Sequence, residues 1–554
     1  MNQRGWMATG LFLLLANVAA AETLNLHLRS RTVAGPELKS QRVVHETKPW
    51  DSKKTAIVVC DMWDKHWCPQ ATQRVGEMAP RMNDVLKAAR AKGVTIIHCP
   101  SDTLDFYKDH PARKRAQMAP VAEAKRPLER WCRIDPEHEA NLPIDDTDGG
   151  CDCNAPVKNY KAWSRQIATL EIDADKDAIT DSAEAYYLMR QRGIENVIVM
   201  GVHTNMCVLG RPFSIRQMVY QGMNVALMRD MTDTMYNPAK SPFVSHFTGT
   251  DLIVEHIEQF WCPTVTSGDF LDGKEFRFPG DKRPHVAIVM AEDEYKTNLT
   301  LPEFAAKELG KDFRVSLLFS HPDKKNDIPG LEVLDTADVL LLSARRRPLP
   351  KEQLDKIRKF IAAGKPVVGI RTATHPFHLR NQKPPAGLDE WPTFDADVIG
   401  SNYSNHHGNN LKAWVWPLEG VKHPILEGIP AGELPIAGSL YVVLPLAKTA
   451  TELMRGKAEG IEQQEPVAWV NTRYDGGKTF YTSLGHPDNF AQPAFRRLLS
   501  NGVYWAAGIE RTPDAALVGD CGGEEKKTSD TWSNIPVPGT WDSHRTELKS
   551  FDGF

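Results

Sequence analysis

The chain has 554 residues, which is too long for one hydrophobic core and is typical of two or three domains. Hydrophobic residues make up 41% and charged residues 25%, so most of the chain has the composition of an ordinary globular protein. The formal net charge of −4 excludes the strong positive field on which nucleic-acid and anionic-membrane binding depend, so we expect neither partner.

The first 21 residues differ from the rest of the chain. Arg4 opens a basic stretch, the apolar segment 11–18 follows, and three alanines end at Ala21. This order is typical of a cleavable signal peptide, and its apolar core is too short for a comfortable membrane span. We therefore expect a secreted or periplasmic protein with no membrane segment after signal removal. Residues 22–50 form an N-terminal extension.

A short apolar run, 55–60 (TAIVVC), predicts a buried strand that ends directly before Asp61. In doubly wound sheets, ligands bind beyond the carboxyl ends of the strands. Asp61 is therefore a candidate general base that takes a proton from a nucleophile and passes it to a leaving group. The alternative is that Asp61 only caps the turn that follows the strand.

The segment 101–165 shows little periodicity, and a loop of this length inside a compact domain is usually functional or disordered. Trp163 lies in this loop, and Trp67 follows the first predicted strand. Both tryptophans are candidates for lining a substrate pocket. Packing in the core is the alternative explanation for each of them.

The chain has nine cysteines, an odd number, so at least one thiol is unpaired. Export makes disulfides possible. Cys151 and Cys153 are too close in the chain for an easy bridge to each other, so they can pair with Cys68 or Cys132, or bind a metal. We expect disulfides here, with free thiols as the alternative, and we expect no metal or other cofactor in the protein.

The most informative stretch is 196–222 (NVIVMGVHTNMCVLGRPFSIRQMVYQG). Its apolar part, 197–202, predicts a buried parallel strand, and a helix is predicted from about Met206 to Gln221. Cys207 then lies where the strand passes into the helix, and free N–H groups and the helix dipole there favour a thiolate. A thiolate among backbone donors can attack a carbonyl carbon. The alternative is one more buried cysteine.

The two strand ends resemble the isochorismatase-like cysteine hydrolases, the family of nicotinamidases and related amidases. The resemblance rests on VVCDMW around Asp61 and GVHTNMCV around Cys207, and it covers 51–268. It implies an Asp–Lys–Cys triad that cleaves a C–N bond through a thioester, with Asp61 as base and Cys207 as nucleophile. It also implies a cis peptide between Val202 and His203, and an oxyanion hole formed by the amides of His203 and Cys207.

The lysine of this triad has no clean counterpart in the sequence. In the family it lies on the strand before the helix that leads to the cysteine strand, and Lys176 stands near that place. Lys176 also lies among three aspartates, as in a solvated turn, and Lys161 and Lys108 are alternatives. Asn205 is a further candidate for binding the substrate. The metal site of nicotinamidases has no clean match, which argues against nicotinamide itself as substrate.

Beyond a linker rich in Gly, Pro and charged residues, 269–282, strands and helices alternate again. The connections between these elements are short, which indicates a second parallel α/β domain. The sequence therefore predicts two doubly wound parallel-sheet domains in tandem, each with three αβα layers. The strands are predicted at 285–294, 314–320, 337–344 and 365–375, and the helices at 301–309 and 351–363.

This second domain, 283–510, resembles the trehalose-utilisation (ThuA-like) domains, relatives of the class I glutamine amidotransferases. The resemblance rests mainly on NHHG around His407 and on GGKTFYTSLGH, which ends at His486. An amidotransferase needs a cysteine on the turn after the strand KPVVGI, and Arg371 stands there, so thiol-based glutaminase chemistry is excluded. Arg371, His375, His407 and His486 are candidates for binding a sugar or another small ligand. The alternative is that the histidines are hydrogen-bonded pocket or core residues.

Three functions remain open on these grounds. The first is a secreted cysteine amidase that acts on a small molecule, with a partner domain that binds a carbohydrate or metabolite. The second is a binding protein that has lost its chemistry, and the third is an isochorismate-type vinyl-ether hydrolase. An exported enzyme would rarely meet isochorismate, which counts against the third. The polar tail, 511–554, is predicted to be mobile or to wrap a neighbour, and a homo-oligomer is compatible with the sequence.

Overall fold

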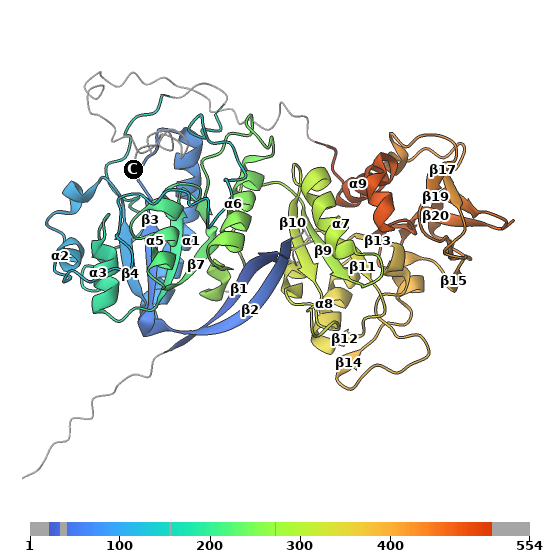
Figure 1. The fold of residues 1–554 in the computed structure, drawn as a ribbon, viewed down its shortest axis with the longest axis horizontal. Helices are drawn as coiled ribbons and strands as arrows, with labels where there is room; N and C mark the ends of the chain where they lie inside the picture. The colour runs from blue at the N-terminus through green and yellow to red at the C-terminus, as the bar shows by residue number, and fades with distance from the viewer. Residues whose placement is uncertain (1–21, 34–40, 154–157, 272, 512–554) are drawn as a thin grey trace, which may run out of the picture.

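The structure is a computed structural model that describes residues 22–33, 41–153, 158–271 and 273–511. The predicted signal peptide and the tail beyond residue 511 lie outside the described residues. The chain forms two mostly parallel sheets, each covered by helices (Figure 1). The predicted α/β fold class is therefore confirmed, with antiparallel strands added at one side of each sheet. Within the described ranges, no helix has the length and apolar character needed to cross a membrane.

The first sheet has a parallel part in which all strands from β8 to β5 run in the same direction. Its central strands are buried on both faces, as expected for continuous Val and Ile runs between two helix layers. The strand order is β2 (Gln41–Asp51), β1 (Thr23–Val33), β8 (Thr264–Val265), β7 (Asn224–Asp233), β6 (Asn196–Val202), β3 (Thr55–Cys60), β4 (Thr95–Cys99) and β5 (Ala178–Ile179).

Strands β3 and β6 are parallel neighbours, with Cys60 opposite Gly201. The residues that follow these two strands therefore meet at one edge of the sheet. Gly201 allows this close approach, because a Cβ at this position would lie 2.0 Å from the carbonyl oxygen of Cys60. The surrounding helical segments are η1 (Ser52–Lys54), α1 (Pro69–Ala91), η2 (Leu104–Tyr107), α2 (Pro111–Gln117), α3 (Glu184–Gln191), α4 (Cys207–Gly210), α5 (Ile215–Tyr220), α6 (His246–Phe260) and η3 (Ser267–Asp269).

The single helix predicted from Met206 to Gln221 is wrong in its middle, because α4 and α5 are separate. Arg211 follows α4 with φ −65° and ψ 158°, which is an extended conformation. The cause is Pro212, because a proline disfavours the helical conformation of the residue before it. The break turns the chain at Arg211, and this matters for the site described below.

The second sheet has five parallel strands followed by four antiparallel ones, which the sequence did not predict. Its strand order is β10 (Arg314–Phe319), β9 (His285–Ala291), β11 (Val339–Ala344), β13 (Val367–Ile370), β21 (Lys478–Thr482), β20 (Gln464–Thr472), β19 (Ala450–Ala458), β16 (Ala413–Pro417) and β17 (Leu434–Ile436). Two small strand pairs lie beside it: β12 (Leu349–Pro350) with β14 (Leu388–Asp389), and β15 (Asn405–His406) with β18 (Tyr441–Val442).

The helix predicted at 351–363 forms as α8 (Lys351–Ala362), which ends before Gly364 in the left-handed conformation. The predicted helix at 301–309 is divided between α7 and a π-helical turn. The helical segments are α7 (Thr297–Phe304), η4 (Ala305–Leu309), η5 (Leu331–Asp335), α8, η6 (Arg371–Thr374), η7 (Asp395–Ile399), η8 (Pro424–Leu426), η9 (Pro487–Ala491) and α9 (Pro493–Ala507).

The N-terminal extension forms a long antiparallel hairpin, β1–β2, that links the two sheets. Figure 1 shows it in dark blue, running from the first sheet towards β10. Arg29 pairs with Thr264 in the first sheet, whereas Val43 is part of the core of the second half. The guanidinium of Arg42 donates to the carbonyl of Ser320 and lies 5.8 Å from the Phe319 ring centroid.

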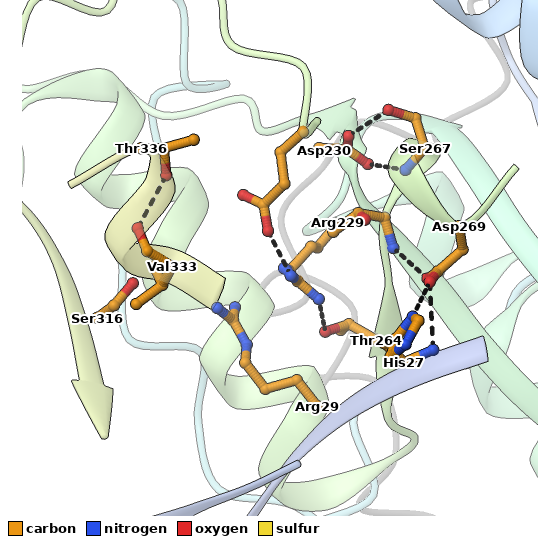
Figure 2. A network of polar contacts seen from close by, with 12 residues as sticks. His27, Arg29, Arg229, Asp230, Thr264, Ser267, Asp269, Ser316, Val333 and Thr336 are labelled. Carbon is orange, nitrogen blue, oxygen red and sulfur yellow. Dashed lines mark hydrogen bonds and ion pairs between the residues drawn. The ribbon is translucent and has the colours of Figure 1, made fainter. Parts of the chain in front are cut away.

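The predicted linker also packs against both halves. Glu275 accepts hydrogen bonds from Arg229, at 2.5 Å, and from Arg314 of β10. These arginines hold the pKa of the Glu275 carboxyl well below its usual range, against the effect of burial, which raises it. Figure 2 shows part of this region, where Asp230 accepts hydrogen bonds from the amide and hydroxyl of Ser267 at 2.8 and 2.6 Å.

Candidate active site

Asp61 and Cys207 are in contact at the carboxyl edge of the first sheet. The Cys207 side chain lies beside the Asp61 carboxyl group, and Oδ1 of Asp61 accepts from the amide of Ser101 at 2.7 Å. Both side chains are buried, with relative exposures of 0% and 1%. Asp61 has a φ of 45°, which is uncommon for a residue other than glycine, although Asp adopts it more readily than most residues.

The turn that leads from β6 to Cys207 is held from two sides. The peptide bond between Val202 and His203 is cis, and the amide of Thr204 donates to the carbonyl of Asp233 at 2.8 Å. Asn205 donates to Asp146 of the long loop at 2.9 Å and accepts from the amide of Met235 at 3.0 Å. Asn205, a candidate for binding the substrate, therefore fixes the turn to its neighbours.

Arg211 supplies the positive charge of this site, which the sequence analysis missed. Its Nε lies 3.5 Å from Oδ2 of Asp61, and its side chain also lies beside Cys207. The guanidinium is 3% exposed, and its Nη2 lies 3.7 Å from Oδ2 of Asp102. The signal in the sequence was the Arg–Pro pair shortly after Cys207. An arginine before a proline ends the helix and leaves a charged side chain close to the cysteine.

Lys176, the predicted triad lysine, lies elsewhere. It precedes β5, at the amino end of this strand, whereas Asp61 and Cys207 lie at the carboxyl ends of β3 and β6. Its side chain is 69% exposed and its Nζ is 3.8 Å from Asp173. The solvated-turn alternative is therefore the correct one for Lys176. At the carboxyl end of β5 the chain carries Asp181, which accepts from the amide of Asp102 at 3.1 Å.

The electrostatics of the site differ from the expectation of a readily formed thiolate. Burial raises the pKa of the Cys207 thiol well above its usual range, the charge of Asp61 raises it further, and Arg211 opposes both. Burial also raises the pKa of Asp61, while Arg211 lowers it. The helix that begins at Cys207 has only four residues, so its dipole is weak compared with the loss of water. In this structure, Cys207 is a thiol beside a buried base.

Aromatic side chains pack in the same core cluster as Cys207. Trp163 stacks on Trp63, with ring centroids 4.2 Å apart, and His66 meets His203 edge to face at 4.9 Å. Trp67 and Trp163 are 4% and 5% exposed, so both pack in the core. The ring centroids of Trp67 and His66 are 5.2 Å apart. Three cavities of the described structure are lined by other residues. Cys207 itself is 1% exposed, so the thiol is closed off from solvent in this conformation.

In the second half, Arg371 occupies the turn after β13, at the place of an amidotransferase nucleophile. Its φ is 44° and it is 1% exposed. Its Nη1 donates to the carbonyls of Ser439, at 3.2 Å, and Ser483, at 2.8 Å. The guanidinium also lies between the rings of Tyr295 and Tyr441, 4.3 and 4.8 Å from their centroids. All of these contacts of the guanidinium are with other residues of the same domain.

The three candidate histidines of this half each have internal partners too. His375 stacks on Tyr403 with ring centroids 4.4 Å apart, and burial lowers its pKa to about 2. Nε2 of His407 lies 3.2 Å from a carboxylate oxygen of Glu465. His486 accepts from the amide of Asp488 at the start of η9 and is the most exposed of the three, at 32% of its side chain.

Arg371 and His486 approach each other across Gly438. A Cβ built on this glycine would lie 2.9 Å from the Arg371 guanidinium and 3.2 Å from the Cβ of His486. Tyr295 contacts both side chains, at 6.2 Å between the rings in the case of His486. His486 is therefore the side chain of this group that is best placed to meet a ligand.

Comparison with known proteins gives a family match in the C-terminal half of the chain. Residues 286–506 match the family model described as trehalose utilisation, ThuA. No curated protein matches the chain. Among solved structures, a ThuA-like protein from Parabacteroides merdae is 16% identical, with a TM-score of 0.30, over 42% of this chain and 94% of its own.

Two further structures are similar to this chain. A cysteine hydrolase from Pseudomonas syringae pv. phaseolicola is 18% identical, with a TM-score of 0.25, over 40% of this chain and 92% of its own. An isochorismatase family protein from Burkholderia thailandensis is 13% identical, with a TM-score of 0.23, over 39% and 93%. The chain thus carries a ThuA domain in its C-terminal half and is similar, at low identity, to cysteine hydrolases of the isochorismatase family.

Proposed function

We propose that the protein is a cysteine-dependent hydrolase that cleaves a C–N bond of a small amide-type substrate through a thioester. The observation that carries this proposal is the contact between Asp61, Cys207 and Arg211. A nucleophile, a base and a cation in one buried group are the parts that such a reaction needs. The sequence resemblance around Asp61 and Cys207 supports an amide carbonyl as the point of attack.

In the proposed first step, Asp61 takes the proton of Cys207 while the sulfur attacks the carbonyl carbon. The amides of His203 and Cys207 donate to the oxyanion that forms. Arg211 stabilises the sulfur while it carries negative charge, because its guanidinium lies beside Cys207 in the resting site. Collapse of the intermediate breaks the C–N bond, and Asp61 gives its proton to the leaving nitrogen.

In the second step, water replaces the amine. Asp61 is again a carboxylate and takes a proton from the water, whose oxygen attacks the thioester carbon. The carbon–sulfur bond breaks, the acid product leaves, and the proton on Asp61 returns to the sulfur. Because Cys207 is 1% exposed in the resting site, we expect substrate entry to require movement of a segment that buries the thiol.

The other parts of the proposal rest on the sequence. The ThuA-like half binds a sugar or another small ligand, for which His486 beside Arg371 is the most suitable position. The signal peptide directs the protein to the periplasm or the exterior. A homo-oligomer is compatible with the proposed hydrolase and with the proposed ligand binding by the ThuA-like half.

The test is to incubate the protein with a panel of small amides, ureides and imides and to measure the release of ammonia or amine. We expect one class to be cleaved, and we expect Cys207→Ala to reduce kcat by about 10⁴-fold or more, because it removes the nucleophile. Cys262→Ala is the matched control, since Cys262 is also a buried thiol but lies between α6 and β8. Equal turnover by the two variants would contradict the assignment.

A second function, a binding protein without chemistry, is favoured by one observation, the 1% exposure of Cys207 together with its raised pKa. The two functions differ in the response to a thiol-directed probe. A hydrolase with a mobile cover labels at Cys207 and is inactivated, whereas a binding protein cleaves nothing in the panel and labels at Cys207 no faster than at its other buried thiols.

A further inference from the structure

Two sulfur atoms outside the proposed triad lie unusually close together. Cys68 precedes α1, and Cys151 belongs to the long loop, 83 positions later in the chain. Their Sγ atoms are 2.9 Å apart, and neither cysteine is in a disulfide in this structure. A disulfide has an S–S distance of about 2.05 Å, so side-chain movement of about 1 Å would bring the pair to bonding distance.

The geometry also decides between the possible partners. The Sγ atoms of Cys68, Cys151 and Cys153 lie within 4.8 Å of one another, which is the spacing of a thiolate metal site. Cys153, however, is 4.0 Å from Cys68 and is itself disulfide-bonded, so it offers no thiolate. Two thiols remain, and two are too few for a structural zinc site, which takes four ligands.

We propose that Cys68 and Cys151 form a disulfide that ties the long loop to the start of α1. The oxidant is a small or protein disulfide of the compartment, written RS–SR. The sulfur of Cys151 attacks RS–SR and releases one thiol, which carries away the Cys151 proton. The sulfur of Cys68 then attacks Cys151 in the mixed disulfide, and the second RSH leaves with the Cys68 proton.

The exposure of the two thiols gives this order of events. Cys151 is partly exposed, whereas Cys68 is fully buried, so an external disulfide meets Cys151 first. The hydrogen bond with Cys68 also lowers the pKa of Cys151. A more acidic and more accessible thiol is the one that starts an exchange, and the buried thiol completes it.

The bond would strengthen an anchor that the loop already has. Arg74 of α1 donates to Asp152 at 2.8 Å and to Asp233 of β7 at 2.7 Å. Gly150 packs directly on Met235, because a Cβ there would lie 2.4 Å from the Met235 carbonyl group. This part of the loop therefore rests on α1 and on the end of β7, next to the turn that carries Cys207. The proposal does not depend on what Cys207 does.

The test is peptide mapping of the full chain under non-reducing conditions, after alkylation of free thiols. We expect a cross-linked pair that contains Cys68 and Cys151, formed on incubation with oxidised glutathione if the purified protein is reduced, and lost with dithiothreitol. The loop closed by this bond is long, so reduction should lower Tm by roughly 5–10 °C.

Matched variants separate this bond from other thiols. Cys151→Ala should abolish the part of the Tm shift that comes from this pair, whereas Cys132→Ala should keep it. Cys132 lies in the same loop, and its sulfur contacts the carbonyl of Arg133, at 3.8 Å. Finding Cys68 and Cys151 both alkylated after the glutathione treatment, or Cys68 linked to Cys153, would overturn the proposal. One stoichiometric zinc per chain, bound through Cys68, would overturn it as well.

Discussion

The turn after β3 and the turn after β13 use the same backbone device for different ends. Asp61 and Arg371 each follow a buried parallel strand, and their φ values are 45° and 44°. Both side chains are almost fully buried. In each case the positive φ turns a charged side chain across the end of the sheet, where an α/β fold normally presents its ligand site.

The partners of the two side chains make the difference. Arg371 donates to main-chain carbonyls and lies close to two tyrosine rings. Asp61 faces the thiol of Cys207 and the guanidinium of Arg211. A proton can therefore pass between oxygen and sulfur while the positive charge of Arg211 balances the negative charge. A buried charge with neutral partners stabilises one conformation, whereas a buried thiol beside a carboxylate has the groups that the proposed reaction needs.

The largest effect that tests this contrast is expected at Asp61. Asp61→Asn keeps the size of the side chain and the contact with Ser101, but it removes the base. We expect kcat/KM to fall by about 10²–10⁴-fold, the usual contribution of general-base catalysis. The measurement is amine release from the best substrate of the panel, with circular dichroism to show that the fold is retained.

The pH dependence of the wild-type enzyme gives the sign of the Asp61 pKa shift. Burial raises this pKa above the ordinary value, so the carboxylate is lost earlier as the pH falls. We expect kcat/KM to decrease on the acid side with a midpoint above about 4, the ordinary value of an Asp. In Asp61→Asn, kcat/KM should stay at its low value and should not decrease further as the pH falls. A midpoint at or below the ordinary value would show that another group is the base.

Arg211 is expected to have the next largest effect. Arg211→Met retains much of the side-chain volume and removes the charge beside the sulfur, so kcat should fall by about 10²–10³-fold, as for the loss of one electrostatic group in a buried site. Arg211→Lys should recover part of this loss. Lys176→Met is the control and should leave kcat unchanged, because Lys176 is exposed and pairs with Asp173. The reverse result would restore Lys176 as the triad lysine.

For Arg371 we expect an effect on stability and not on hydrolysis. Arg371→Met leaves the buried carbonyls of Ser439 and Ser483 without their donor and removes the stacking with the tyrosines. The free energy of unfolding of the C-terminal half should fall by about 2–4 kcal/mol in a denaturant titration. Arg345→Met, at a surface ion pair with Glu294, should change it by less than about 1 kcal/mol. A large loss of amide hydrolysis in Arg371→Met would mean that the two turns act together.

The smallest effect is expected at Pro212. Pro212→Ala removes the restriction that keeps Arg211 extended, and α4 could then continue into α5. The ion pair with Asp61 opposes this change, so we expect kcat/KM to fall by less than about 10-fold. The size of the decrease depends on how often the Arg211 side chain leaves Asp61. A loss as large as that of Arg211→Met would show that the proline alone positions the arginine.

Local patterns were sufficient to predict the α/β class and the places of Asp61 and Cys207. Apolar runs such as TAIVVC and NVIVMGV predict buried strands because burial on both faces selects Val and Ile. The residue after each run must lie at the carboxyl edge, and neighbouring parallel strands bring two such residues together. These inferences need only the short-range period of the chain and one rule of sheet geometry.

Contacts between distant segments decided the rest. Arg211 supplies the cation and Lys176 does not, because the edge on which a side chain lies depends on where its strand begins and ends. Cys207 is a buried thiol and not the predicted thiolate, because packing around it removes the water that a charge needs. Arg371 and the candidate histidines have internal partners that stand up to 112 positions away in the chain. No local pattern encodes such pairings, since burial and charge pairing are properties of the packed molecule.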